Sequence, residues 1–246
     1  KRIFSLSILF VLFSCSQHEG GYCALVNPLI GSGGHGHVFI GANVPHGMIS
    51  VGPNNVSEGW DWCSGYHDSE HTIAGFAQTH LSGTGVTDLG EIVLMPYLGE
   101  PSLEKGTAQG DGFAVPFDKK DEIVRPGYYS VDLMDGAVNV QLTASERIAY
   151  HNYVKNSLGG NTGNLGLILD LKSSARSLLF RQGLQDFSFR QVDEYTVTGY
   201  RKSDEWARDH MVWYAVRFSL PVACVNGEGP VYALDFGDAA SVQARV

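Results

Sequence analysis

Residues 127–154 read GYYSVDLMDGAVNVQLTASERIAYHNYV, and this stretch decides the fold class. Apolar and polar side chains alternate along two runs of it, which predicts two strands that each bury one face. The alternating apolar positions are Tyr129, Val131, Leu133, Val138, Val140 and Leu142. Asp135-Gly136 lies between the runs and is typical of a type I′ turn, which needs a positive φ at both positions. The stretch therefore predicts an antiparallel hairpin, and residues 146–154 continue it as a third strand.

Strand signals recur toward the C-terminus, and no stretch has the periodicity of an amphipathic helix of several turns. The expected elements are a strand over Leu165–Leu171, a hairpin joining Phe187 and Phe189 to Tyr195–Tyr200, and strands over Met211–Leu220 and Val231–Phe236. Strands that follow one another without helices favour antiparallel sheets packed face to face. We therefore predict an all-β fold, with one antiparallel β-sandwich domain over residues 26–246. Within it, residues 26–96 and 99–122 show little periodicity and are expected to be dominated by loops.

The composition is that of a globular protein with few charges. Of the 246 residues, 43% are hydrophobic, 17% are charged and 30 are glycine. A chain of this length can bury most of its apolar surface without disulfides. The net charge is -9 and no block of Lys or Arg occurs, which argues against nucleic-acid binding because that needs a basic surface. A neutral ligand such as a sugar is compatible with this charge.

The N-terminus has the pattern of a targeting segment. Lys1 and Arg2 precede the almost wholly apolar run Ile3–Phe13, which is too short to span a bilayer and has the length of a signal-peptide core. It ends in LFSC, similar to a bacterial lipobox, so we expect residues 1–15 to be a lipoprotein signal with Cys15 as the lipidated residue. An ordinary secretory signal is the alternative.

Either signal predicts export, to the periplasm or the cell surface, with the membrane reached only through the lipid. Residues 16–25 are then a tether between lipid and domain. The other cysteines, Cys23, Cys63 and Cys224, allow at most one intramolecular disulfide.

Residues 27–48 form a glycine-rich segment, NPLIGSGGHGHVFIGANVPHGM. Glycine permits positive φ and a close approach of backbone to a ligand. No Gly-Lys-Ser/Thr follows, which argues against a phosphate-binding loop. A tight loop packed for structural reasons is the remaining alternative to a ligand-binding loop.

Six of the nine histidines fall between residues 35 and 80, which raises a zinc site as a hypothesis. His35 and His37 would face the same way on a strand, and His67 and His71 would align on a helix. No HExxH motif occurs, and nothing in the sequence shows which three would converge. We therefore assign no metal ligand and expect most of these side chains to bond hydroxyls or neighbouring loops.

Residues 58–67, EGWDWCSGYH, place two tryptophans in a glycine-bordered loop. An exposed indole offers a flat apolar surface to the C–H face of a sugar ring, although each tryptophan could instead be part of the core. Glycoside hydrolysis needs two carboxyl groups flanking the scissile bond. Candidates are available at Asp61, Asp68, Glu70, Asp88 and Glu91, but nothing pairs any two of them, and no GxSxG motif of a serine hydrolase occurs.

Several motifs, in this order, resemble glycoside hydrolase family 92, a family of exo-acting α-mannosidases. They are VNPLIGSGGHGHVFIGANVPHGM (26–48), EGWDWCSGYH (58–67), FAQTHLSGTGVTDLGEIVLMP (76–96), LTASERIAYHNY (142–153), GYRKSDEWARDHMVWYAVRFS (199–219) and YALDFGD (232–238). Against the family pattern, Gln78 replaces an expected His, His46 an aromatic residue and Ile40 a Pro.

The resemblance implies an N-terminal, supersandwich-like β-sandwich followed by an (α/α)6 barrel that is absent from this chain. It implies a calcium-dependent, inverting enzyme that removes α-linked mannose, with α-1,2 linkages as the favoured ones, and whose catalytic acid and base lie in the C-terminal domain. The expected partners are an α-mannose-containing glycan and that C-terminal domain, which is also expected to supply most calcium ligands.

The same resemblance implies that the sandwich contributes a Trp-bearing loop to the sugar pocket. Carried onto this sequence, the substrate-binding residues are Trp60, Asp61, Trp62 and Cys63, with Gly33, Gly34 and His35 as the pocket wall. Trp62 is the strongest of these candidates, and no catalytic residue is assigned. A non-catalytic, surface carbohydrate-binding β-sandwich lipoprotein is the alternative.

Overall fold

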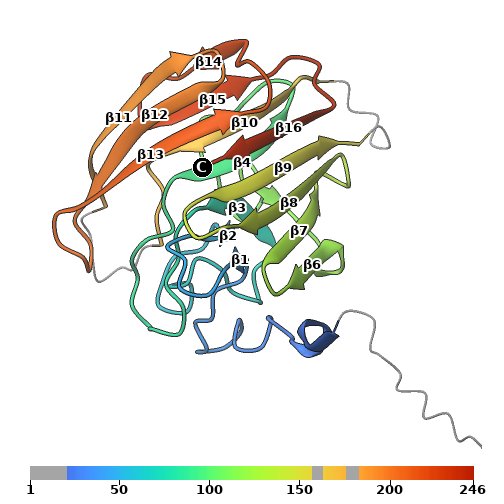
Figure 1. Cartoon of the computed structure of the whole chain (residues 1–246), viewed down its shortest axis with the longest axis vertical. Coiled ribbons are helices and arrows are strands. Elements are labelled where there is room, and N and C mark those ends of the chain that lie inside the picture. The colour runs from blue at the N-terminus through green and yellow to red at the C-terminus, as the bar shows by residue number, and fades with distance from the viewer. Residues whose placement is uncertain (1–20, 157–162, 176–182) are drawn as a thin grey trace, which may run out of the picture.

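The computed structural model describes residues 21–156, 163–175 and 183–246, and these residues form two antiparallel β-sheets (Figure 1). Apart from strands, this part of the chain contains two short 3-10 helices, η1 (Gly21–Leu25) and η2 (Lys119–Asp121). The prediction of an all-β antiparallel sandwich is thus confirmed. Within the described ranges, no helix has the length and apolar character needed to cross a membrane.

The first sheet has the strand order β1-β2-β3-β4-β10-β15-β14, with β5 paired to β3. Its strands are β1 (Ala42–Asn43), β2 (Ser50–Asn55), β3 (Thr72–Ala77), β4 (Val93–Leu98), β5 (Val115–Pro116), β10 (Leu165–Asp170), β14 (Cys224–Asn226) and β15 (Val231–Asp235). Strands β3 and β10 are buried at every position. Both faces of the centre of this sheet are therefore covered.

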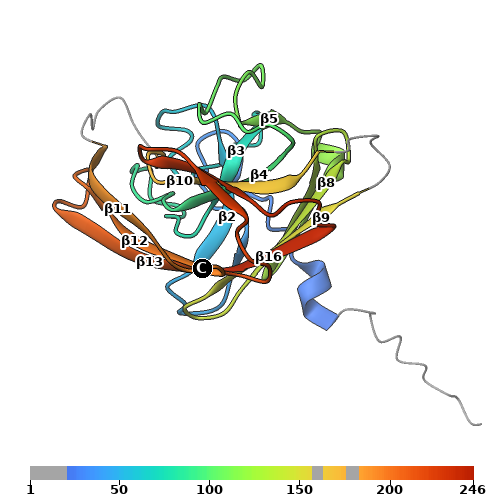
Figure 2. The same cartoon turned by 90° about the horizontal axis from the view of Figure 1, so that it is seen from above.

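The second sheet has the order β11-β12-β13-β16-β9-β8-β7-β6. Its strands are β6 (Glu122–Arg125), β7 (Tyr128–Leu133), β8 (Val138–Ala144), β9 (Ala149–Lys155), β11 (Leu184–Asp193), β12 (Thr196–Ser203), β13 (His210–Phe218) and β16 (Ser241–Arg245). Figure 2 shows this sheet curving around the first. Strands β8 and β9 alternate buried and partly exposed residues along most of their length, so one face packs inward and the other meets solvent.

A single hydrophobic core fills the space between the sheets. Its fully buried aliphatic and aromatic side chains come from both sheets, among them Ile73, Phe76, Leu142, Tyr153 and Leu167. Burying each such side chain stabilises the fold by roughly 1.5–3 kcal/mol relative to leaving it exposed. Within the described ranges Cys23, Cys63 and Cys224 are free thiols, so packing rather than a disulfide between them joins the sheets.

The hairpin predicted from residues 127–154 is confirmed. Strands β7 and β8 pair with Leu133 opposite Val138, and β8 pairs with β9. Asp135 and Gly136 both have positive φ, as the turn requires. The later strands also lie where the sequence predicted them, with Phe187 opposite Arg201 in the β11–β12 hairpin.

Residues 26–96 are dominated by loops, as expected, but β2, β3 and most of β4 also lie there and are neighbours in the first sheet. These strands are covered on both faces, so polar residues do not alternate with apolar ones. In β2, SVGPNN also combines Gly, Pro and Asn, which are rare in strands. Residues 99–122 match the expected loop apart from β5, η2 and Glu122, which begins β6.

A buried arginine ties the second sheet to the loop before β4. Arg201 of β12 is fully buried and bonds the carboxylate of Glu91, while its Nε donates to the Leu171 carbonyl (2.9 Å). Glu205 lies 3.7 Å from the same guanidinium. Since an uncompensated buried charge is costly, this contact fixes the position of residues 88–91 relative to the sheet.

Candidate functional site

Three loops meet against β2 of the first sheet, and hydrogen bonds hold them together. They comprise residues 31–41, 57–70 and 78–92. The Gly83 N–H donates to the His37 carbonyl (2.7 Å), which joins the third loop to the first. The Asp68 N–H donates to the Ser32 carbonyl (3.0 Å), which joins the second loop to the first. We call this region the loop end.

Asn54 and Asn55, at the end of β2, anchor the loop end through their side chains. Asn55 donates to the Thr72 carbonyl (2.9 Å) and accepts from the His67 N–H (2.7 Å). Asn54 donates to the Gly90 carbonyl (2.9 Å). Both amides are buried, so water cannot reach them and these protein groups supply their hydrogen-bond partners.

Gly65 allows the second loop to lie directly against this anchor. It has a φ of +84°, and an added Cβ would lie 2.4 Å from Asn54 Oδ1 and 2.8 Å from the His80 ring. The Asn55 N–H donates to the Gly65 carbonyl (2.7 Å). The loop thus needs glycine at this position both for its backbone conformation and for space.

Residues 59–65 form a series of tight turns that present the two tryptophans differently. The Trp62 N–H donates to the Gly59 carbonyl and the Cys63 N–H to the Trp60 carbonyl (both 3.2 Å). Trp60 is 51% exposed, while Trp62 is partly buried and Cys63 is buried. Burial raises the pKa of the Cys63 thiol, so this side chain is neutral and faces the interior.

Trp60 stands at the surface between two histidines. Its Nε1 donates to the Gly85 carbonyl (2.8 Å), which fixes the indole. The ring centroids of His37 and His35 lie 4.3 Å and 5.0 Å from it. The exposed indole is therefore held in one orientation before any ligand arrives.

His35 bonds the carboxylate of Asp61, the residue after Trp60. The distance from His35 Nδ1 to Asp61 Oδ1 is 2.6 Å. This hydrogen bond holds the pKa of Asp61 below its ordinary value. The pair lies at the surface, where its contribution to stability is small, but it fixes two polar groups beside an aromatic platform.

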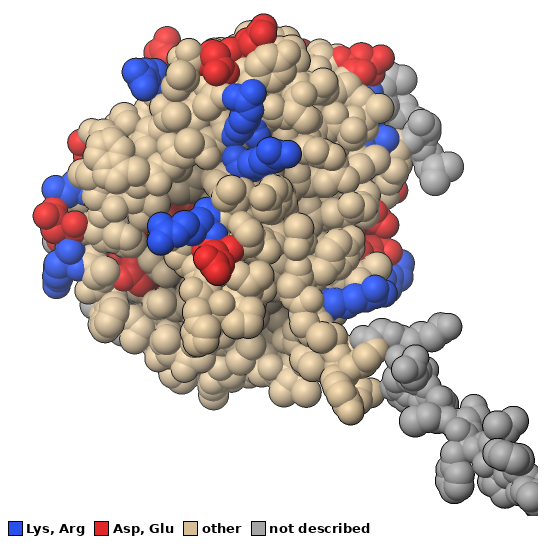
Figure 3. All heavy atoms as spheres, viewed as in Figure 1, with Lys and Arg blue, Asp and Glu red and all other residues tan. Residues whose placement is uncertain are grey.

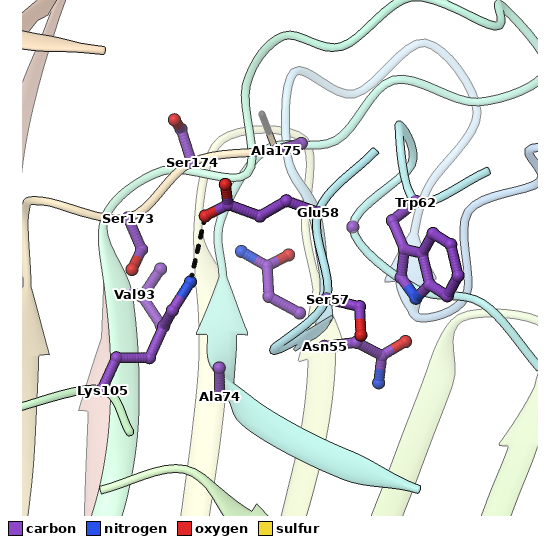
Figure 4. Close-up of a pocket in the computed structure, with 12 residues that line it drawn as sticks. Asn55, Ser57, Glu58, Trp62, Ala74, Val93, Lys105, Ser173, Ser174 and Ala175 are labelled. Carbon is purple, nitrogen blue, oxygen red and sulfur yellow. Dashed lines mark hydrogen bonds and ion pairs between the residues drawn. The ribbon is translucent and has the colours of Figure 1, made fainter. Parts of the chain in front are cut away.

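Trp62 lies on the edge of a neighbouring pocket. Figure 4 shows it at the opposite end of that pocket from Lys105, whose ammonium bonds the Glu58 carboxylate at 3.3 Å. The pocket is also lined by Asn54, Asn55, Ser57, Gly65, Ala74, Val93, Ser173, Ser174 and Ala175. On its other side the Trp62 ring lies 5.0 Å from His67. Its indole Nε1 is buried without a hydrogen-bond partner among the described residues.

The chain matches the model of the glycosyl hydrolase family 92 N-terminal domain over residues 25–229. This match covers most of the chain. The chain belongs to glycoside hydrolase family 92.

Relatives in this family are much longer than the chain. An uncharacterized secreted glycosidase from Arthroderma benhamiae is 30% identical over 171 residues, which make up 67% of this chain and 22% of the fungal protein. The structure of a family 92 α-mannosidase from Bacteroides thetaiotaomicron, solved with mannoimidazole, is 25% identical with a TM-score of 0.81. That comparison covers 91% of this chain and 32% of the mannosidase.

A family 92 inverting mannosidase from Bacteroides thetaiotaomicron VPI-5482 has the same fold, with a TM-score of 0.66 and 23% identity over 91% of this chain and 29% of that one. This chain thus spans about a third or less of each relative. The family 92 sandwich is only one part of those proteins.

Two carboxylates considered as catalytic candidates have structural partners in this family 92 domain. Asp88 is buried and accepts from the backbone N–H groups of Leu89 (2.9 Å) and Ala207 (2.7 Å). Glu91 is bonded to Arg201 and to Ser203. Neither group is free to exchange protons with a substrate at the surface.

Gln78, the departure from the family motif, lies in the interior. Its Nε2 donates to the Phe76 carbonyl (3.0 Å) and the Ile92 carbonyl (2.8 Å), while its Oε1 accepts from His151 Nε2 (2.9 Å). His151 belongs to β9, so this side chain joins the two sheets beneath the loop end. The substitution therefore concerns the support of the site rather than its surface.

The sequence-predicted residues fall into two groups in space. His35, Trp60 and Asp61 are in contact at the surface. Trp62 reaches the glycine-rich loop through His67, whose Nε2 donates to the Gly34 carbonyl (3.0 Å). Gly33 is partly buried beside Asp68, where an added Cβ would lie 3.4 Å from the Asp68 Cβ.

Sequence reasoning missed His37 and Gly85, which complete the surroundings of Trp60. The spacing of His35 and His37 suggested a shared direction, but only on a strand. Both lie in a loop, and His37 has a φ of +55°, a conformation that no sequence pattern indicated. His71, paired with His67 in the sequence analysis, is exposed and takes no part in this group.

We expect the stability of the domain to fall between pH 7 and pH 5 because His80 and His151 are buried. Burial lowers the pKa of His80 to about 4 and that of His151 to about 3, whereas an unfolded histidine has a pKa of about 6.5. The unfolded state therefore binds more protons below pH 6.5, and protonation favours it. The expected loss at pH 5 is about 2 kcal/mol for each histidine, measured by urea unfolding.

The replacement His151→Gln should lower the number of protons taken up on unfolding near pH 5 by about one. His71→Gln, at an exposed position, should leave that number unchanged. Equal stability of the wild-type domain at pH 5 and pH 7 would contradict the assignment of neutral, buried imidazoles.

Proposed function

We propose that this chain is the N-terminal domain of an exo-acting α-mannosidase and that its loop end forms one wall of the sugar-binding site. The observation that carries the proposal is the similarity, over 91% of this chain, to an α-mannosidase solved with mannoimidazole. The loop end supports it independently, because it combines an oriented aromatic ring with polar groups at the surface.

The chemistry of the loop end suits a neutral sugar. Trp60 and Trp62 offer flat apolar surfaces to the C–H face of a pyranose ring. The side chains of His35 and Asp61 and the exposed backbone of Gly34 can exchange hydrogen bonds with hydroxyl groups. A few placed polar groups beside an apolar surface are typical of small-molecule sites.

A second domain is needed to complete this wall into a pocket. The loop end carries exposed apolar side chains from the segment that leads into it and from its loops, namely Leu25, Val26, Leu29, Ile30 and Trp60. Figure 3 shows few charged atoms over the lower part of the molecule, where the N-terminal loops lie in the same view in Figure 1. Exposed apolar surface of this kind is typical of an interface, and we propose the C-terminal domain as its occupant.

The finer features of the proposal are inversion of configuration, calcium dependence and preference for α-1,2-linked mannose. Calcium prefers six to eight oxygen ligands. Among the His, Cys, Asp and Glu side chains of the described residues, the one group of three close metal donors combines two imidazoles with one carboxylate, which does not fit calcium. The calcium ligands are therefore expected in the C-terminal domain, together with the catalytic acid and base.

In the longer protein, Trp62→Ala should lower kcat/KM for an α-mannoside at least about tenfold. Contact between a sugar C–H face and indole contributes on the order of 1.5–3 kcal/mol, which corresponds to roughly 10–150-fold in the specificity constant. The thermal midpoint should change by only a few degrees because Trp62 is not fully buried. Steady-state kinetics and calorimetry on the same preparation measure both effects.

The matched control is Trp213→Ala, which removes a 71% exposed indole from β13 in the second sheet and should leave kcat/KM unchanged. The 246-residue chain alone should release no mannose. Turnover by this chain alone would overturn the shared-site proposal. Near-wild-type kinetics for a folded Trp62→Ala protein would exclude that residue from the pocket.

We also propose that the protein is exported and held at a bacterial membrane by lipid on Cys15. The residues concerned lie outside the described ranges, so the proposal depends on the apolar run ending in LFSC and on the similarity to a secreted glycosidase. Cys15→Ala should move the protein from the membrane to the soluble fraction. Unchanged fractionation would favour attachment by other means.

A further inference from the structure

His35, His37 and Asp61 form a compact group of possible metal ligands at the loop end. One donor atom from each residue lies within 4.8 Å of the other two. Asp61 Oδ1 lies 2.6 Å from His35 Nδ1 and 3.5 Å from His37 Nε2. Two imidazoles and a carboxylate are a ligand set that zinc and other divalent transition metals favour.

His37 provides the second, independent observation. Its side chain is 5% exposed, yet Nε2 has no hydrogen-bond partner among the described residues. This nitrogen lies 3.5 Å from Asp61 Oδ1, beyond normal hydrogen-bond distance. A buried polar atom without a partner is costly in a folded protein and indicates an unseen water or ion.

We propose that His35 Nδ1, His37 Nε2 and Asp61 Oδ1 bind a divalent transition-metal ion, for which Zn²⁺ is the reference. This departs from the sequence analysis, which assigned no metal ligand.

The distances from Asp61 to the two histidines require only a small adjustment. Zinc–ligand distances of 2.0–2.2 Å place tetrahedral donors about 3.3 Å apart, close to the separation of His37 and Asp61. The His35–Asp61 pair must open by about 0.7 Å, and His35 can do this because its side chain is 73% exposed. The buried His37 would then be the fixed ligand and His35 the one that closes over the ion.

Three protein ligands leave a fourth position open. Trp60 covers one side of the two imidazoles, while Gly34 and Gly36 beside His35 are exposed. The open position would hold water or an oxygen donor such as a sugar hydroxyl, as in zinc sites with three protein ligands. Binding of the ion itself requires no sugar, so this inference can fail without affecting the proposed function, and the reverse also holds.

The experiment measures Zn²⁺ binding to the metal-free chain, without a histidine tag, by isothermal titration calorimetry. One ion should bind per chain, Co²⁺ should give the visible spectrum of a low-symmetry four-coordinate site, and excess Ca²⁺ should not displace Zn²⁺. His35→Ala, His37→Ala and Asp61→Asn should each weaken binding at least about tenfold, because even losing an outer partner of a metal ligand commonly has that effect.

His71→Ala and Asp68→Asn are matched controls, since they replace an exposed histidine and an exposed aspartate outside the group. Both variants should bind Zn²⁺ like the wild type. His35 is exposed and Asp61 only partly buried, so these two variants keep the test decisive if His37→Ala fails to fold. The absence of saturable Zn²⁺ binding, or wild-type binding by folded His35→Ala and Asp61→Asn, would overturn the proposal.

Discussion

The loop end depends on the two buried amides of Asn54 and Asn55. They belong to consecutive residues at the end of β2 and bond to segments outside that strand, at Thr72, Gly90 and His67. Because they are buried, each bond that is lost would leave a polar group without a partner, at a cost of about 1–3 kcal/mol. The position of the tryptophan-bearing loop is thus set by β2 of the first sheet rather than by the loop itself.

That dependence explains which features the sequence could predict. The β7–β8–β9 region was predictable because one face of each strand is buried and the other meets solvent. Apolar and polar residues therefore alternate in its sequence. Strand β2 was not predictable in this way, because it is almost wholly buried and contains Gly52, Pro53 and two asparagines. Its two asparagines, which in a sequence suggest a loop, belong to the strand and hold the neighbouring loops in place.

The sequence predicted which residues belong to the candidate site better than it predicted how they are arranged. The motif EGWDWCSGYH and the family resemblance identified the loop, but not that Trp60 is the exposed indole and Trp62 the partly buried one. That difference arises from consecutive tight turns and from the bond between Trp60 and Gly85. The contact between His35 and Asp61 depends on positive φ angles at Gly34 and His37, which spacing alone does not indicate.

The central claim is that the loop end of this family 92 domain contacts the sugar in a site shared with a second domain. A crystal structure of the longer protein with mannoimidazole, the ligand of the related mannosidase, tests it most directly. The account predicts sugar atoms within about 4 Å of Trp60 or Trp62, the distance of apolar contact, and the C-terminal domain on the opposite side of the ring. A sugar bound by the C-terminal domain alone, with residues 58–67 out of contact, would contradict it.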